Sequence, residues 1–102
     1  MEVEFDQDKN QNNIDNRGID FSTAENFDFT SALIVQDQRK NYGEDRYSAI
    51  GYIEQRLYVL IFTPRDAILR VISLRKANKR ERGKYHEQKI WKNNYWQSTV
   101  EW

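Results

Sequence analysis

The chain has 102 residues, with 16 acidic and 16 basic side chains and no cysteine. This length suits one domain with a modest hydrophobic core, so we expect a single domain over residues 1–102. The lack of cysteine excludes disulfides and thiolate metal sites, and no apolar run approaches the roughly 20 residues that cross a bilayer. Because the acidic start of the chain does not fit a signal peptide, we expect a soluble cytoplasmic protein without a membrane partner.

The charges are distributed unevenly along the chain. Residues 1–30 carry eight acidic and two basic side chains, whereas residues 65–92 carry ten basic and three acidic ones. Such an asymmetry indicates a polyanionic partner for the basic half. The alternative is that the two halves neutralise each other in the fold or are simply solvated.

The N-terminal part begins with a candidate strand at residues 3–5 and a helix. Asp6 can cap a helix over residues 7–17, and Gly18 can end it in the left-handed conformation. Ile14 is the only large apolar residue of this helix, so the helix cannot bury a wide apolar stripe.

A second short helix is predicted directly afterwards. Ser22 and Glu25 have the spacing of a capping box, in which the hydroxyl and the carboxylate each satisfy a free backbone N–H. The helix should begin there and place Ala24 and Phe27 inward.

Four apolar runs of strand length follow, at residues 31–35, 46–53, 57–62 and 68–74. The third run lacks alternation, which is typical of a central strand covered on both faces. A break at residues 63–66 contains a proline and an aspartate, both turn residues, so the last three runs predict an antiparallel meander. Arg70 shares a face with Ile68 and Ile72, which is unusual for a strand face that packs into a core.

The C-terminal part combines a basic helix with an aromatic tail. Asn78 and Glu81 repeat the cap-plus-acid spacing, so a helix should run from about residue 79 to at least residue 85. The tail's aromatic side chains either stack on RNA bases or, as we favour, cover a flank of the core or a dimer interface. These side chains are Trp91, Tyr95, Trp96 and Trp102.

A series of short motifs now suggests a family. The motifs are Phe5-Asp6-x-x-Lys9, Asn13-Ile14, Gly18-Ile19-x-Phe21, Asp37-x-Arg39, Tyr42-Gly43-Glu44-x-Arg46-Tyr47, Ile50-Gly51, Phe62-Thr63-x-Arg65, Ile72-Ser73-x-Arg75-Lys76-Ala77, Arg80-Glu81-Arg82 and Tyr85. In this order and spacing they resemble the BrnT-type toxins of bacterial type II toxin–antitoxin pairs, small relatives of the RelE-like ribonuclease fold. The resemblance covers about residues 4–85, and residues 86–102 form an aromatic extension. Arg17 stands where the family usually has a histidine, which leaves the role of that position open.

The resemblance implies an α+β fold, with two N-terminal helices packed on a four-stranded antiparallel sheet and a further helix after it. It implies a metal-independent RNA endonuclease that blocks translation and is neutralised by a BrnA-type antitoxin. It also implies that the complex represses its own operon, so that DNA is contacted only through the antitoxin. A homodimer and a heterotetramer with the antitoxin are both compatible with it.

Metal-free RNA cleavage requires that the ribose 2′-OH lose a proton, that the charge on the phosphate be stabilised, and that the leaving oxygen be protonated. Guanidinium groups suit the second task, because their fork matches phosphate oxygens. The predicted catalytic residues are Arg65, Arg70, Arg75, Glu44 and Tyr85. For Arg70 the alternative is a structural salt bridge, to Glu44 or to an N-terminal acid.

The basic residues around these candidates are predicted to hold the RNA backbone. They are Arg46, Lys76, Arg80, Arg82 and Lys84. For the helical ones the alternative is a solvated helix face. The acidic residues are scattered without a metal-ligand spacing, so we expect neither a metal nor a cofactor.

Two other functions remain open at this stage. The chain can be a catalytically inactive toxin homologue that acts only as antitoxin partner and corepressor, a reading favoured by Arg17 and the altered tail. It can also be a non-enzymatic RNA-binding module, which would bind RNA in a strongly salt-dependent manner.

Overall fold

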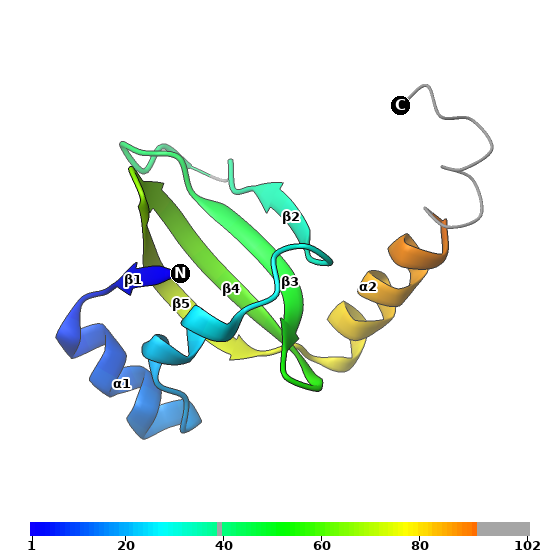
Figure 1. The fold of residues 1–102 in the computed structure, drawn as a ribbon, viewed down its shortest axis with the longest axis horizontal. Helices are drawn as coiled ribbons and strands as arrows, with labels where there is room; N and C mark the ends of the chain where they lie inside the picture. Colours follow the sequence, from blue (N-terminus) through cyan, green and yellow to red (C-terminus); the bar gives the residue numbers. More distant parts are fainter. Residues whose placement is uncertain (39, 92–102) are drawn as a thin grey trace.

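The computed structural model describes residues 1–38 and 40–91, and it has an α+β fold (Figure 1). The strands are β1 (Glu2–Glu4), β2 (Leu33–Gln36), β3 (Tyr47–Ile53), β4 (Arg56–Arg65) and β5 (Ile68–Lys76). The helices are α1 (Gln7–Arg17), the 3₁₀ helix η1 (Phe21–Asn26) and α2 (Lys79–Trp91). The aromatic tail beyond Trp91 lies outside the described residues.

The sheet differs from the expected four-stranded antiparallel one. It has five strands in the order β1-β5-β4-β3-β2. β1 runs parallel to β5, with Glu2 opposite Ile68 and Glu4 opposite Arg70, so the sheet is mixed. The expectation was wrong because the short candidate strand at residues 3–5 joins the sheet beside the last strand, while the helical segment after it leads the chain to β2 at the opposite edge (Figure 1).

Helix α1 has the predicted limits but an unexpected packing. Asp6 accepts a hydrogen bond from the Lys9 N–H at 3.0 Å, and Gly18 ends the helix with φ of 70°. The residues that α1 buries are Asn10 and Asn13. The side-chain amide of Asn13 donates to the carbonyls of Ile19 and Leu74, both at 2.9 Å. A helix without a wide apolar stripe is therefore held to β5 by hydrogen bonds, which satisfy the buried amide.

The second predicted helix is a 3₁₀ helix, and its cap is a different residue. Asp20, and not Ser22, is the N-cap, and its carboxylate accepts from the Ser22 N–H at 2.9 Å. The inward placement of Ala24 and Phe27 is confirmed, since they are 0% and 6% exposed.

Strand β4 is the central strand, as its continuous apolar sequence indicated. Leu57 and Val59 are buried towards one face of the sheet and Leu60 and Phe62 towards the other. The predicted break at residues 63–66 is shorter in the structure. β4 continues through Arg65, because a proline is tolerated near a strand end, and the turn that follows leaves Asp66 with φ of 55°.

A β-bulge explains the position of Arg70 on β5. Leu69 and Val71 belong to the core, so Arg70 points to the other face. The register shifts opposite Ile61 and Phe62, because Ile61 pairs with Ser73 and Phe62 with Val71. Ile72 is thus the extra residue of the bulge, and the face that carries Arg70 continues with Ser73. The charged side chain therefore does not enter the core.

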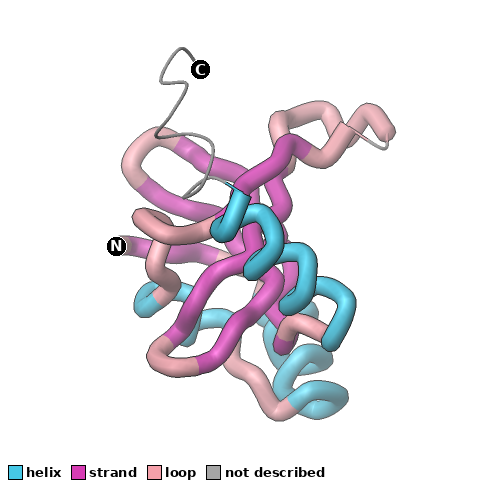
Figure 2. The backbone as a smooth tube through the Cα atoms, turned by 90° about the vertical axis from the view of Figure 1, so that its right-hand side faces the viewer, coloured by secondary structure: helices cyan, strands magenta, loops and turns pink. Residues whose placement is uncertain are grey.

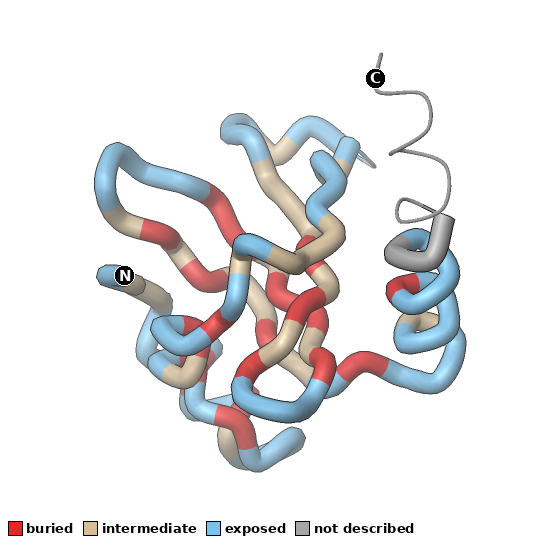
Figure 3. The backbone as a smooth tube through the Cα atoms, turned by 45° about the vertical axis from the view of Figure 1, so that its right-hand side comes forward, coloured by how far each residue is buried: buried red, intermediate tan, exposed pale blue. Residues whose placement is uncertain are grey.

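The two faces of the sheet are covered unequally. η1 and the segment after it cover the core face, and buried residues concentrate there and in the central strands (Figure 3). α2 lies across the other face (Figure 2). It packs there through Tyr85, which forms a second buried cluster with Leu57, Val59 and Ala77. We call the part of this face from Val59 outwards the open sheet face, and it carries most of the candidate functional residues.

Candidate functional site

The strand register arranges the open sheet face in three rows. The row nearest α2 contains Leu33, Ile50, Val59 and Arg75. The middle row contains Val35, Ser48, Ile61 and Ser73. The far row contains Thr63, Arg70 and Glu4. The predicted catalytic arginines therefore flank a central strip of apolar and hydroxyl side chains.

Four charged residues form what we call the strand-end cluster, which consists of Glu4, Glu44, Arg65 and Arg70. Arg65 donates to the Glu44 carboxylate at 3.1 Å and lies 3.7 Å from the Glu4 carboxylate. Arg70 lies 3.8 Å from the other oxygen of Glu4. Three of the five predicted catalytic residues thus share one site, in which Glu4 links the two guanidinium groups. Arg70 does have the N-terminal acidic partner that its structural alternative proposed.

The electrostatics of the strand-end cluster favour ionised side chains. The hydrogen bond from Arg65 is the main cause that holds the pKa of Glu44 below its ordinary value, and the charges of Arg65 and Arg46 add to it. Arg46 stacks on the Tyr42 ring, with its guanidinium carbon 3.7 Å from the ring centroid. Glu44 is therefore a carboxylate at neutral pH.

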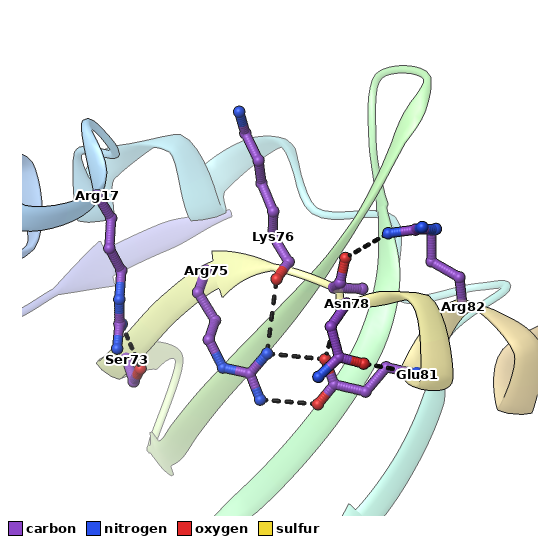
Figure 4. Close-up of polar contacts among 8 residues, drawn as sticks. Arg17, Ser73, Arg75, Lys76, Asn78, Glu81 and Arg82 are labelled. Atoms are coloured by element: carbon purple, nitrogen blue, oxygen red, sulfur yellow. Dashed lines mark hydrogen bonds and ion pairs between the residues drawn. The ribbon is translucent and has the colours of Figure 1, made fainter.

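Three further arginines, Arg75, Arg80 and Arg82, lie at the opposite end of β5, where α2 begins. Figure 4 shows Arg75 and Glu81 joined by two hydrogen bonds of 2.7 Å each. Glu81 also accepts from the Asn78 N–H at 2.9 Å, and the Asn78 side chain accepts from the Glu81 N–H at 2.8 Å. The predicted capping box is thus confirmed, and it holds the acidic partner of Arg75 in place.

The Arg75 side chain remains 35% exposed in its pair with Glu81. Both terminal nitrogens of Arg75 donate to Glu81, and Nη1 also approaches the Lys76 carbonyl at 3.5 Å. Among the described residues, no acceptor contacts the Nε edge. The hydrogen bonds to Glu81 raise the pKa of Arg75 and lower the pKa of Glu81, so both stay charged. A fixed guanidinium with a free edge is suited to bind a phosphate.

A groove of about 710 Å³ lies between α2 and the open sheet face. α2 contributes Arg80, Glu81, Lys84 and Gln88 to it, and β5 contributes Arg75. The floor is formed by the rows nearest α2, including Leu33, Val35, Ile50, Val59 and Ile61. The groove therefore has a mainly apolar floor and a wall with the cations Arg80 and Lys84, and the segment around Asp37 adds polar groups at its border.

The remaining predicted residues have different surroundings. Tyr85 is 4% exposed, and its hydroxyl donates to the Ser31 carbonyl at 2.9 Å, which fits a packing role. Arg82 donates to the Ala77 carbonyl at 2.9 Å, so it supports the start of α2. Lys76 points away from the sheet face to which Arg75 points (Figure 4).

The two arginine groups do not converge on one point. The β4 residues opposite Arg70 and Arg75 are Thr63 and Val59, which are four positions apart. At about 3.3 Å per residue this is a separation of roughly 13 Å along the strand. A single phosphate cannot contact both, whereas an extended polynucleotide laid along the open sheet face can.

The site residues predicted from the sequence did not include Ser73, and Arg17 had no predicted role. Arg17 reaches from α1 past the edge of β5, where Nη1 donates to the Ser73 hydroxyl at 3.3 Å (Figure 4). The same nitrogen donates to the Asn13 side chain at 2.9 Å. The sequence shows only that Arg17 follows Asn13 by four residues, about one helical turn.

Within residues 1–38 and 40–91, no three His, Cys, Asp or Glu side chains gather in a way that could hold a metal ion. In the same part of the chain, no helix is long and apolar enough to span a membrane.

Comparison with known proteins assigns the chain to a family. No curated protein matches it. A family model described as the ribonuclease toxin BrnT of type II toxin–antitoxin systems matches residues 5–81. The matched region contains Glu44, Arg65, Arg70 and Arg75 and ends before Tyr85. Because the match covers most of the chain, the protein belongs to the BrnT family of ribonuclease toxins of type II toxin–antitoxin systems.

Proposed function

We propose that this chain is a metal-independent RNA endonuclease that cuts RNA along the open sheet face and thereby blocks translation in the cytoplasm. A BrnA-type antitoxin neutralises it, and the complex represses its own operon through the antitoxin's DNA-binding part. The observation that carries the proposal is the strand-end cluster, in which an ionised carboxylate, Glu44, lies 3.1 Å from Arg65, and Glu4 links Arg65 to the second guanidinium, Arg70.

In this proposal the strand-end cluster performs the chemistry. Glu44 takes the proton from the ribose 2′-OH as that oxygen attacks the neighbouring phosphate. Arg65 and Arg70 stabilise the negative charge that grows on the phosphate. The P–O bond to the 5′-oxygen breaks, and this oxygen takes a proton from water, which reaches the exposed end of the sheet. The products are a 2′,3′-cyclic phosphate and a 5′-hydroxyl.

Glu81 is less suited to be the base, although it lies in the groove. Its carboxylate already accepts two hydrogen bonds from Arg75 and one from the Asn78 N–H. Arg75 instead binds a phosphate farther along the same RNA through its Nε edge. Arg46, Arg80 and Lys84 add backbone contacts, and Tyr85 positions α2 without touching RNA.

The test is RNA cleavage by purified protein in the presence of EDTA, together with growth on induced expression of the chain alone. Glu44→Gln, Arg65→Ala and Arg70→Ala should each lower the cleavage rate by about 10²-fold or more, the scale of lost general-base or charge stabilisation. Arg75→Ala should act mainly on RNA affinity. Arg56→Ala is the matched control, because Arg56 is an exposed arginine at the other end of β4.

Two substrate controls sharpen the test. RNA with a 2′-deoxy substitution at the cut site should resist cleavage, because the attacking hydroxyl is missing. Full toxicity of folded Arg65→Ala and Arg75→Ala variants would show that the site assignment is wrong. Loss of cleavage in EDTA would show that the reaction depends on a metal.

A catalytically inactive partner is the second candidate function. The observation in its favour is that Arg65, Arg70 and Arg75 are each already paired with a carboxylate. In that case expression without antitoxin is harmless, while the antitoxin still binds.

A further inference from the structure

The groove beside α2 has a floor that suits a protein better than RNA. Leu33 and Ile50 extend the buried cluster around Tyr85 towards solvent. Val35 next to them is 61% exposed, which makes it one of the most exposed large apolar side chains among the described residues. RNA contacts are dominated by charged and polar groups, so an exposed aliphatic floor indicates an apolar partner surface.

The wall of the groove has a regular spacing of polar groups. Arg80, Lys84 and Gln88 follow one another at intervals of four residues and all line the groove. Groups four residues apart lie on one helix face, about 6 Å apart along the axis. Carboxylates at intervals of four residues on a neighbouring helix could therefore each pair with one of these side chains.

The width of the site also fits a helix. The floor extends from β2 to β5. Three strand spacings of about 4.8 Å give roughly 14 Å, compared with about 10–12 Å for the diameter of a helix with its side chains.

We infer that this groove is the docking site for an amphipathic helix of the antitoxin. The apolar stripe of that helix covers Leu33, Val35 and Ile50, and acidic residues at positions i and i+4 pair with Arg80 and Lys84. The inference rests on the antitoxin partner of the proposed function. The same helix would cover Arg75, and so remove one of the phosphate-binding groups from the RNA path.

The experiment measures binding of the purified full-length chain to the recombinant product of the reading frame next to its gene, by calorimetry. Val35→Glu places a carboxylate on the floor, and Lys84→Glu reverses a charge on the wall. Each should weaken binding by about tenfold or more, as expected for central contacts. Lys79→Glu is the control, because Lys79 is an exposed lysine of the same helix outside the groove, and it should change binding less than about twofold. Melting curves show that each variant is folded.

Several results would overturn the inference. Unchanged antitoxin binding by Val35→Glu and Lys84→Glu would do so, as would equal weakening by the Lys79→Glu control or no binding by the wild-type chain. Conversion of a wild-type dimer to a monomer by Val35→Glu, with antitoxin binding intact, would assign the floor to a second copy of the chain. A loss of RNA affinity alone would assign the groove to RNA. Because the assay needs no cleavage, an inactive protein that still shows these losses would refute the proposed catalysis but support the docking site.

Discussion

Glu81 accepts two hydrogen bonds of 2.7 Å from Arg75 while its Oε1 atom also caps the Asn78 N–H. One carboxylate thus fixes both the start of α2 and the orientation of an arginine on the open sheet face. Fold stability and the RNA binding that we propose for Arg75 are therefore coupled at Glu81.

Glu81→Ala should lower the free energy of unfolding by about 1–3 kcal/mol. The change removes the hydrogen bond that Glu81 contributes to the capping box and a charge-assisted pair with Arg75, and these two losses account for a value of that size. Urea unfolding measures it. Glu87→Ala, which removes an exposed acid from the same helix, should stay within about 0.5 kcal/mol of the wild type.

The contribution of Glu81 to the free energy of unfolding should also depend on pH. Its pKa is lowered in the folded protein by Arg75, so its stabilising effect is complete above the unfolded pKa of about 4.3 and is lost as pH falls through the folded pKa. The difference in unfolding free energy between wild type and Glu81→Ala should therefore be constant from pH 7 to about 5 and shrink at lower pH. A difference that persists undiminished at pH 2 would contradict the ion pair.

Asn13→Asp should be strongly destabilising. The Asn13 amide donates to two carbonyls, those of Ile19 and Leu74, at a site where the side chain is 7% exposed. A carboxylate there has no donor and faces both oxygens, so the free energy of unfolding should fall by about 2 kcal/mol or more. Asn12→Asp on the exposed side of the same helix is the control, and equal effects of the two changes would argue against the hydrogen-bonded attachment of α1.

Replacing either of two glycines by alanine should change the stability of the protein, in opposite directions for the two positions. A Cβ on Gly51 would lie 2.6 Å from the Phe27 ring and 3.0 Å from the Ala32 Cβ, so Gly51→Ala should cost about 1–3 kcal/mol. A Cβ on Gly83 meets nothing within 4 Å, so Gly83→Ala should stabilise α2 by about 0.5–1 kcal/mol. Melting temperatures that move in the same direction would contradict this packing.

The features that the sequence predicted well are local ones. The caps at Asp6 and at Asn78 with Glu81 involve residues three positions apart, so the pattern contains all of the interaction. The attachment of α1 was missed because Asn13 binds a carbonyl 61 residues away, and no local pattern reports such a contact. The parallel pairing of β1 with β5 was missed for the same reason.

The candidate site could be predicted in residue type but not in arrangement. The arginines were identified as a set from their density and from the family motifs. Their division into two groups depends on the strand register and on the bulge at Ile72, which sends Arg70 and Arg75 to one face at a separation of several residues. The partner of Arg65, Glu44, comes from a loop 21 residues earlier, and only the fold brings the two together.

The position of Arg17 leads to a last prediction, on RNA affinity. Its guanidinium lies at the Ser73 hydroxyl on the edge of β5, the strand that also carries Arg75 (Figure 4). If RNA follows the open sheet face, Arg17 adds one phosphate contact at this edge. Arg17→Gln removes the charge and should weaken RNA binding at all salt concentrations. It should also reduce the slope of log K against log[salt] by about 0.7, the value for one contact to a single strand.

Fluorescence anisotropy with a single-stranded RNA between 50 and 300 mM salt measures both quantities, with the inactive Glu44→Gln background preventing cleavage. Arg56→Gln in the same background removes an equal charge from the exposed first residue of β4 and should leave the slope unchanged. Equal slopes for the Arg17 and Arg56 variants would exclude Arg17 from the RNA path.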